Sequence, residues 1–143
     1  MNSQIKKITA ILLLFIVILT LFMLPVNADE PTRSKYYSSV VTTSGVVSGV
    51  LNIHNGYTVS SGTGFTSAQI QTYVERKTLG LFWVKVDNGQ PNKTWVDTST
   101  SKTYSKNYTL TLTQTGTYRV TAEYTFYGSS GSESITRQVT VTY

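Results

Sequence analysis

A strict alternation of apolar and polar residues near the C-terminal end of the chain is the feature that most constrains its fold. The alternate apolar positions between residues 117 and 126 are filled by Tyr118, Val120, Ala122, Tyr124 and Phe126. Threonine, arginine and glutamate occupy the positions between them. A period of two is typical of a β-strand that packs one face on a core and exposes the other. No window beyond residue 35 shows a convincing helical period, so we predict an all-β protein.

Two more segments at this end of the chain alternate in the same way. Residues 108–113 and 135–143 each place apolar side chains on one face and threonine-rich polar side chains on the other. The turn signals at 114–116 and 128–131 separate the three predicted strands. Arg137 falls in the apolar register of the last strand. Either a bulge shifts the phase there or the arginine stem lies over the rim of the core.

The middle of the chain predicts another hairpin. Residues 68–77 and 81–86 are expected to pair around the turn Thr78-Leu79-Gly80. A loop follows, and residues 94–96 are expected to form a short edge segment. From residue 36 onward, threonine, valine, tyrosine and serine dominate the chain, which is strand chemistry.

The first third is expected to add two or three strands, at residues 40–41, 46–53 and 57–59, with Asn55-Gly56 as the strongest hairpin-turn signal. About seven short strands in a chain of this size fit an immunoglobulin-like antiparallel β-sandwich. A β-barrel and a jelly roll are the alternatives. Tyr118 directly follows a turn, so we expect its ring to pack in the core while its hydroxyl ties the corner to the backbone.

The N-terminal end has the order of a secretory signal peptide. Lys6 and Lys7 precede an apolar run over residues 8–24, Pro25 then breaks the run, and small residues lead to Ala28. We expect a signal-peptide helix that is cleaved after Ala28. An uncleaved membrane anchor is the alternative, since the run is close to the shortest length that spans a bilayer.

This pattern predicts three parts: a signal peptide at 1–28, a flexible lead-in at 29–36 and an immunoglobulin-like domain at 37–143. The expected location is secreted, or extracellular. No second apolar segment follows the signal, so no membrane span is expected after cleavage.

Composition removes several classes of chemistry. The chain has no cysteine, which excludes thiol catalysis, cysteine-bound zinc and redox switching. Its formal net charge is +5, and the basic residues beyond the signal are scattered rather than clustered. Nucleic-acid binding requires a basic patch, so it is not expected. A modest positive charge favours attraction to anionic surfaces.

No catalytic set is recognised. His54 is the only histidine, and it adjoins the expected Asn55-Gly56 turn, where an exposed histidine is ordinary. A glycosidase would need two carboxylates across a cleft. The candidates are expected to be solvent-face charges paired with Lys or Arg: Glu75, Asp87, Asp97, Glu123 and Glu133. We therefore expect no enzyme activity, no catalytic residue, no metal site and no cofactor.

Aromatic residues are the best candidates for a binding site. The chain contains ten tyrosines and two tryptophans. Such rings on an outer sheet face can stack on sugars or anchor a protein partner. We select Tyr73, Trp83, Trp95 and Tyr127 as candidate binding residues, and burial of the same rings in the core or at its rim is the alternative. The expected partner is a cell-wall or matrix polysaccharide, or an extracellular protein.

The blocks 116–124, 70–77 and 83–86 carry a family resemblance. The first is similar to the last strands of small bacterial immunoglobulin-like domains, and the other two are similar to their central hairpin. With the signal peptide, the chain resembles small uncharacterised secreted proteins of Gram-positive bacteria that have this sandwich. The resemblance implies a fold and a compartment, and no activity, because the sandwich carries many unrelated functions.

We expect a non-enzymatic binding or structural domain at the cell surface or in an extracellular matrix, with an adhesion or biofilm-type role. The contact would use an aromatic and hydroxyl-rich sheet face, or an edge strand that adds to a partner's sheet. One alternative is a carbohydrate-binding module. Another is a secreted effector or inhibitor that acts through a loop such as 60–67 or 87–94.

Overall fold

The computed structural model describes residues 34–143, and these form eight β-strands and one short 3-10 turn. The predicted signal peptide, its cleavage site at Ala28 and the lead-in up to residue 33 lie outside the described residues. The elements in chain order are β1 Tyr37–Val47, β2 Val50–Val59, β3 Phe65–Thr78, β4 Phe82–Lys85, η1 Pro91–Lys93, β5 Trp95–Ser99, β6 Thr103–Thr111, β7 Thr117–Gly128 and β8 Gly131–Thr142.

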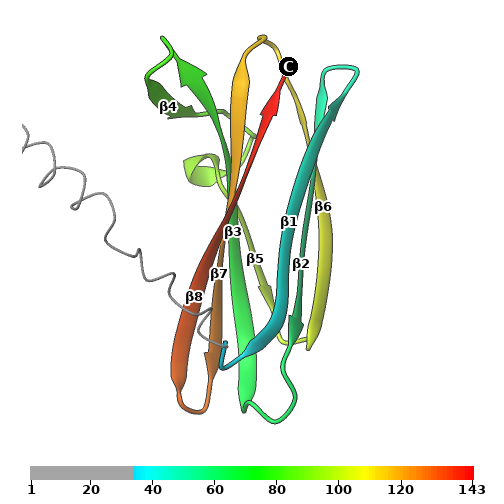
Figure 1. Ribbon diagram of the computed structural model, residues 1–143, viewed down its shortest axis with the longest axis vertical. Helices are drawn as coiled ribbons and strands as arrows, with labels where there is room; N and C mark the ends of the chain where they lie inside the picture. Colours follow the sequence, from blue (N-terminus) through cyan, green and yellow to red (C-terminus); the bar gives the residue numbers. More distant parts are fainter. Residues whose placement is uncertain (1–33) are drawn as a thin grey trace, which may run out of the picture. The chain divides into compact units, whose positions relative to one another are not determined.

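The strands form two antiparallel sheets that lie in two layers (Figure 1). One sheet has the order β1-β2-β6, and the other has the order β4-β3-β7-β8, with β5 also paired to β3. Both β4 and β5 pair with the same edge of β3, β4 near its end and β5 near its start. The predicted all-β class and the sandwich-like arrangement of antiparallel sheets are therefore confirmed.

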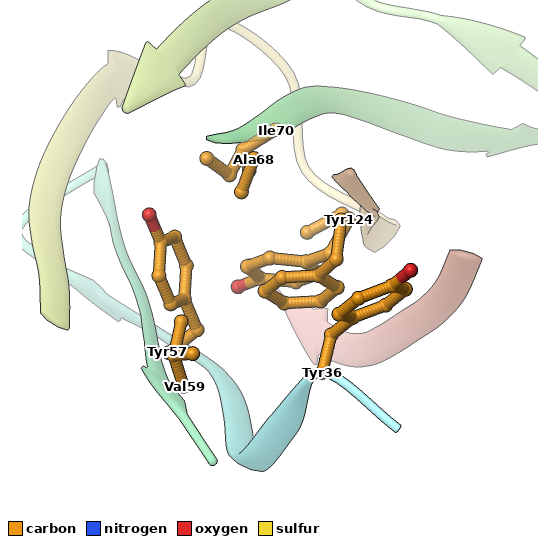
Figure 2. Close-up of a cluster of buried hydrophobic side chains, with 8 residues drawn as sticks. Tyr36, Tyr57, Val59, Ala68, Ile70 and Tyr124 are labelled. Carbon is orange, nitrogen blue, oxygen red and sulfur yellow. The ribbon is translucent and has the colours of Figure 1, made fainter. Parts of the chain in front are cut away.

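The alternation read from the sequence sets the inner face of each sheet. The even positions of β7 from Tyr118 to Phe126 are all buried, as predicted. The buried side chains gather into two clusters. The Tyr124 cluster (Figure 2) contains Tyr36, Tyr57, Val59, Ala68, Ile70, Ala122, Tyr124 and Phe126. The Tyr118 cluster contains Leu51, Ile53, Val74, Tyr108, Leu112, Tyr118 and Val120.

A layer of buried polar groups separates the two clusters. Asn55 of β2 donates a 2.7 Å hydrogen bond to the Thr72 hydroxyl of β3. The Tyr124 hydroxyl lies 2.8 Å from the Thr42 hydroxyl and donates to the Val41 carbonyl at 2.7 Å. Each of these bonds crosses from one sheet to the other, so they align the layers as well as filling the middle of the core.

Tyr118 plays the predicted corner role. Its ring is buried in the Tyr118 cluster, and its hydroxyl donates to the backbone carbonyl of Gln114, just before β7 begins. Burial raises the pKa of this phenol, with Tyr143 adding to the effect and Arg76 opposing it. The bond holds the chain where it turns from β6 into β7.

The Asn55-Gly56 turn prediction is wrong, because both residues lie inside the central strand β2. The actual turn is Ser48-Gly49, with φ values of 49° and 77°, which suit the positive-φ turn of a two-residue hairpin. Gly56 serves close packing instead. A Cβ there would come within 3.1 Å of the Tyr104 carbonyl and 3.2 Å of the Val41 side chain. An Asn-Gly pair is typical of a tight turn, but glycine is also found where neighbouring strands approach closely, so the pair alone does not distinguish the two cases.

Arg137 lies in an unbroken ladder between β7 and β8, directly opposite Ala122. The bulge alternative is therefore wrong. The side chain keeps the apolar register and remains exposed, which an edge strand allows because a long side chain can extend past the rim to water.

The folded unit begins at Ser34 rather than at residue 37. Tyr36, which we assigned to the lead-in, is buried. Its hydroxyl contacts the Ser130 hydroxyl at 3.0 Å and donates to the Gly131 carbonyl at 3.1 Å. These contacts join the start of the described chain to the β7–β8 turn. Within residues 34–143, no helix is long and apolar enough to cross a membrane.

We predict that Tyr118→Phe lowers the free energy of unfolding by about 1 kcal/mol, since the ring stays in the core while one hydrogen bond is lost. Urea unfolding followed by circular dichroism measures the change. Tyr127→Phe is the matched control, because the Tyr127 side chain is exposed, and it should change stability by less than about 0.5 kcal/mol. Equal stability of Tyr118→Phe and the wild type would contradict the corner role.

Candidate binding surface

Exposed apolar side chains gather at the β3–β4 hairpin. Leu79 is 85% exposed, Leu81 75%, Phe82 62% and Val84 50%. Single exposed apolar residues are normal on a protein surface, whereas adjacent ones mark contact sites. Figure 1 shows this hairpin standing clear of the β1-β2-β6 sheet. The hairpin tip, defined as Leu79, Leu81 and Phe82, is therefore our first candidate for a contact site.

The turn at the tip is held in a conformation that its sequence disfavours. Leu79 and Gly80 have φ values of 52° and 69°, and the turn closes with a 3.1 Å bond from the Leu81 amide to the Thr78 carbonyl. A positive φ costs a leucine about 1–2 kcal/mol relative to glycine. Exposed leucines and an unfavourable φ both reduce stability, and such features cluster at functional positions.

The outer face of the larger sheet brings aromatic rings and cations together next to the tip. Trp83 of β4 lies opposite Lys77 of β3. The Arg119 guanidinium of β7 lies 4.3 Å from the Trp83 ring centre. The same guanidinium binds Glu75 through two nitrogens at 2.9 Å and 2.7 Å. Three strands thus fix the tryptophan in place.

A second ring–cation pair lies beside the first. The Lys85 ammonium is 4.1 Å from the Tyr73 ring centre and donates to the Thr94 hydroxyl at 3.2 Å. The Tyr73 hydroxyl donates to Glu123 at 3.2 Å. Burial raises the pKa of Tyr73, and the Glu123 charge raises it further. We call Tyr73, Glu75, Trp83, Lys85 and Arg119 the aromatic–cation row.

The row brings together two of the four predicted binding residues. Tyr73 and Trp83 share the outer face, with Glu75 between them in the register of β3. Arg119 lies over the Trp83 ring and Lys85 lies over the Tyr73 ring, so a sugar could stack on those ring faces only after displacing the cations.

The other two predicted residues lie elsewhere. Trp95 faces the interior, where it stacks on Tyr108 with ring centres 4.9 Å apart and packs against the Tyr118 cluster. Tyr127 is on the outer face but pairs with Ser67, near the start of β3 and far from Trp83 in the register. The four residues therefore do not form one site.

Two of the five candidate acidic residues form the predicted ion pairs, and Asp87, Glu123 and Glu133 form none within residues 34–143. Glu75 is paired with Arg119, as predicted. Asp97 binds Lys106 and accepts hydrogen bonds from Tyr108 and, at 3.0 Å, from Tyr104. Burial and the Asp97 charge raise the pKa of Tyr104. This group connects β5 of the larger sheet to β6 of the smaller sheet, so these contacts help to hold the two sheets together.

His54 lies in the middle of β2, not beside a turn as expected. Its Nδ1 is 2.8 Å from the Asn107 side-chain oxygen. A shallow hollow at this point is lined by uncharged residues, including Thr43, Asn52 and Thr109. Within residues 34–143, no three His, Asp or Glu side chains gather in a way that could hold a metal ion.

The comparisons with known proteins found no matching family model, no matching curated protein and no matching solved structure. The candidate surface is thus supported by its geometry alone.

Sequence reasoning missed the hairpin tip. The segment 79–84 has one glycine and five apolar residues across a tight turn, flanked by Lys77 and Lys85. A hairpin this short cannot bury apolar residues on both of its faces. That conflict between the apolar pattern and the space available for burial is the feature of the sequence that indicates an exposed tip.

We predict that Arg119→Gln exposes the Trp83 ring. In a Trp95→Phe background, which leaves Trp83 as the only tryptophan of the chain, its fluorescence should shift to longer wavelength and acrylamide should quench it more strongly. Arg137→Gln is the control, because Arg137 is an exposed cation on β8. Unchanged Trp83 fluorescence in Arg119→Gln would contradict the stacking.

We also predict that the domain loses stability above pH 10. Burial is the largest cause that raises the pKa of Tyr57, Tyr73, Tyr104, Tyr118 and Tyr124 above the ordinary value of 10.0. A folded state that holds these protons more tightly gains stability that is fully present below pH 10 and is lost as the pH rises further. The measurements are tyrosinate absorbance and urea unfolding as functions of pH. Constant unfolding free energy above pH 10 would contradict this.

Proposed function

We propose that this chain is a secreted, non-enzymatic binding or structural domain that acts at the cell surface or in an extracellular matrix. The single observation that carries the proposal is the hairpin tip, where Leu79, Leu81 and Phe82 are exposed on a strained turn. Burying such side chains against a partner would contribute about 1.5–3 kcal/mol each. The exposed tip thus lowers the stability of the free domain, and its burial would stabilise a complex with a partner.

We further propose that the sandwich is immunoglobulin-like. The pairing of β1-β2-β6 in one layer and β3-β7-β8 in the other agrees with the separation of strands A, B, E and C, F, G in that class. The Tyr118 corner adds support. One strand differs: β5, in the place of strand D, pairs with β3 instead of joining the β6 edge.

Export is supported by the order of charge, apolar run and small residues up to Ala28. The partners predicted from the sequence are a cell-wall or matrix polysaccharide, or an extracellular protein. The carbohydrate-binding alternative has support of its own, because Tyr73 and Trp83 lie on one face. The two hypotheses assign binding to different residues. The main proposal assigns it to the hairpin tip, and the carbohydrate-binding alternative assigns it to the rings of Tyr73 and Trp83.

The test is fractionation of a culture that exports the full chain, with the protein measured in the medium, wall and matrix fractions. We expect most of the wild type in the wall or matrix, and most of the double variant Leu81→Ser, Phe82→Ser in the medium. The matched control is Val47→Ser, Val96→Ser, which changes two exposed valines elsewhere and should be retained like the wild type.

Each other outcome has a definite meaning. Recovery of the wild type as a free monomer in the medium would overturn the proposal and favour a diffusible effector or inhibitor. Retention that is lost in Tyr73→Ala and Trp83→Ala, but kept in the tip variant, would overturn the role of the tip and favour the carbohydrate-binding alternative. Urea unfolding of every variant separates lost binding from lost folding.

A further inference from the structure

We infer that the partner of the hairpin tip is an anionic lipid bilayer: Leu79, Leu81 and Phe82 insert at the membrane surface while the cations behind them contact phosphate headgroups. The inference rests on the proposed function and names the partner for that same surface. Its basis is the shape of the hairpin and the order of its side chains from the tip to the base.

Each face of the hairpin carries an apolar side chain close to the tip. Trp83 points to the outer face of the sheet, in register with Lys77. Phe82 and Val84 are in register with Thr78 and Arg76, on the opposite face, and both are at least half exposed. A flat protein surface covers one face of a two-stranded ribbon. Lipid surrounds the whole tip, so it satisfies both faces at once.

The tip also limits the cost of placing backbone in an apolar layer. Unpaired amide and carbonyl groups are expensive in lipid. Here the turn closes on itself through the bond from the Leu81 amide to the Thr78 carbonyl, and only Leu79 and Gly80 lie between those residues. The most exposed side chains, Leu79 and Leu81, adjoin this closed turn. Shallow insertion therefore buries apolar side chains with few unpaired polar groups.

Charge follows the apolar tip in the order that a membrane surface requires. Trp83 lies next to the tip, and tryptophan favours the interface between headgroups and acyl chains. Five cations lie near the base of the hairpin: Arg76, Lys77, Lys85, Lys93 and Arg119. Glu75 is neutralised by Arg119. Each lysine or arginine near an anionic leaflet adds to the attraction.

A hollow of about 400 Å³ lies at the base of the hairpin on the side of Val84. Arg76, Thr111 and Thr113 line it together with Asp87. The guanidinium and hydroxyl groups can donate to the oxygens of a phosphate ester, while the Asp87 carboxylate reduces the net positive charge of the hollow. The hollow provides a place for one lipid headgroup beside the inserted tip.

The test is co-sedimentation of the protein with phosphatidylcholine vesicles, and with vesicles of equal parts phosphatidylcholine and phosphatidylglycerol. We expect binding to the anionic vesicles, a shift of Trp83 fluorescence to shorter wavelength in the Trp95→Phe background, and weaker binding as salt is added. Leu81→Ser, Phe82→Ser and Lys77→Gln, Lys85→Gln should each weaken binding about tenfold or more. Lys102→Gln, Arg137→Gln removes two exposed cations elsewhere and should weaken it far less.

Failure of this inference is distinguishable from failure of the proposed function. Wild-type protein that ignores anionic vesicles overturns the lipid partner, and tip-dependent retention in the wall fraction would then point to a protein or polysaccharide. Equal binding to both kinds of vesicle overturns the role of the cations. Binding that survives Leu81→Ser, Phe82→Ser overturns insertion of the tip. Circular dichroism and urea unfolding confirm that each variant is folded.

Discussion

The pairing of β3 with β7 is the interaction on which the rest of the structure depends. Their ladder extends from Phe65 opposite Gly128 to Arg76 opposite Tyr118. It places one face of both strands against the smaller sheet and the other face in solvent, where the aromatic–cation row forms. The remaining strands of the larger sheet pair outward from this centre. Because β3 continues past Arg76 to Thr78, its end leaves the core and carries the hairpin tip.

Polar groups inside the sandwich set how the two sheets face each other. The chain has no cysteine, so no disulfide joins the layers. The bonds from Asn55 to Thr72 and between Tyr124 and Thr42 cross the middle of the core instead. A buried hydrogen bond adds little net stability, but a broken one is costly, so such pairs select one alignment among many. The apolar side chains on either side of these pairs therefore do not have to set the alignment of the sheets.

The sequence was a good guide where one face of a strand is buried. The period of two over 117–126 predicted the inner residues of β7, and the turn before Tyr118 predicted its corner contact. It was a poor guide at Asn55-Gly56, since glycine is used there to let Tyr104 and Val41 approach closely. At Trp95 it left both burial and exposure open, because an aromatic residue on an edge strand suits either face and only its partner Tyr108 decides.

Residue type and local spacing are enough to predict the strand chemistry, the two faces of the longest strands and the absence of thiol chemistry. Which outward side chains meet depends instead on how the strands pair in three dimensions. Trp83, Arg119 and Glu75 come from three strands, and their contacts depend on the register of those strands. Exposure of the hairpin tip was also a tertiary outcome, since the same apolar residues would be buried if the smaller sheet extended that far.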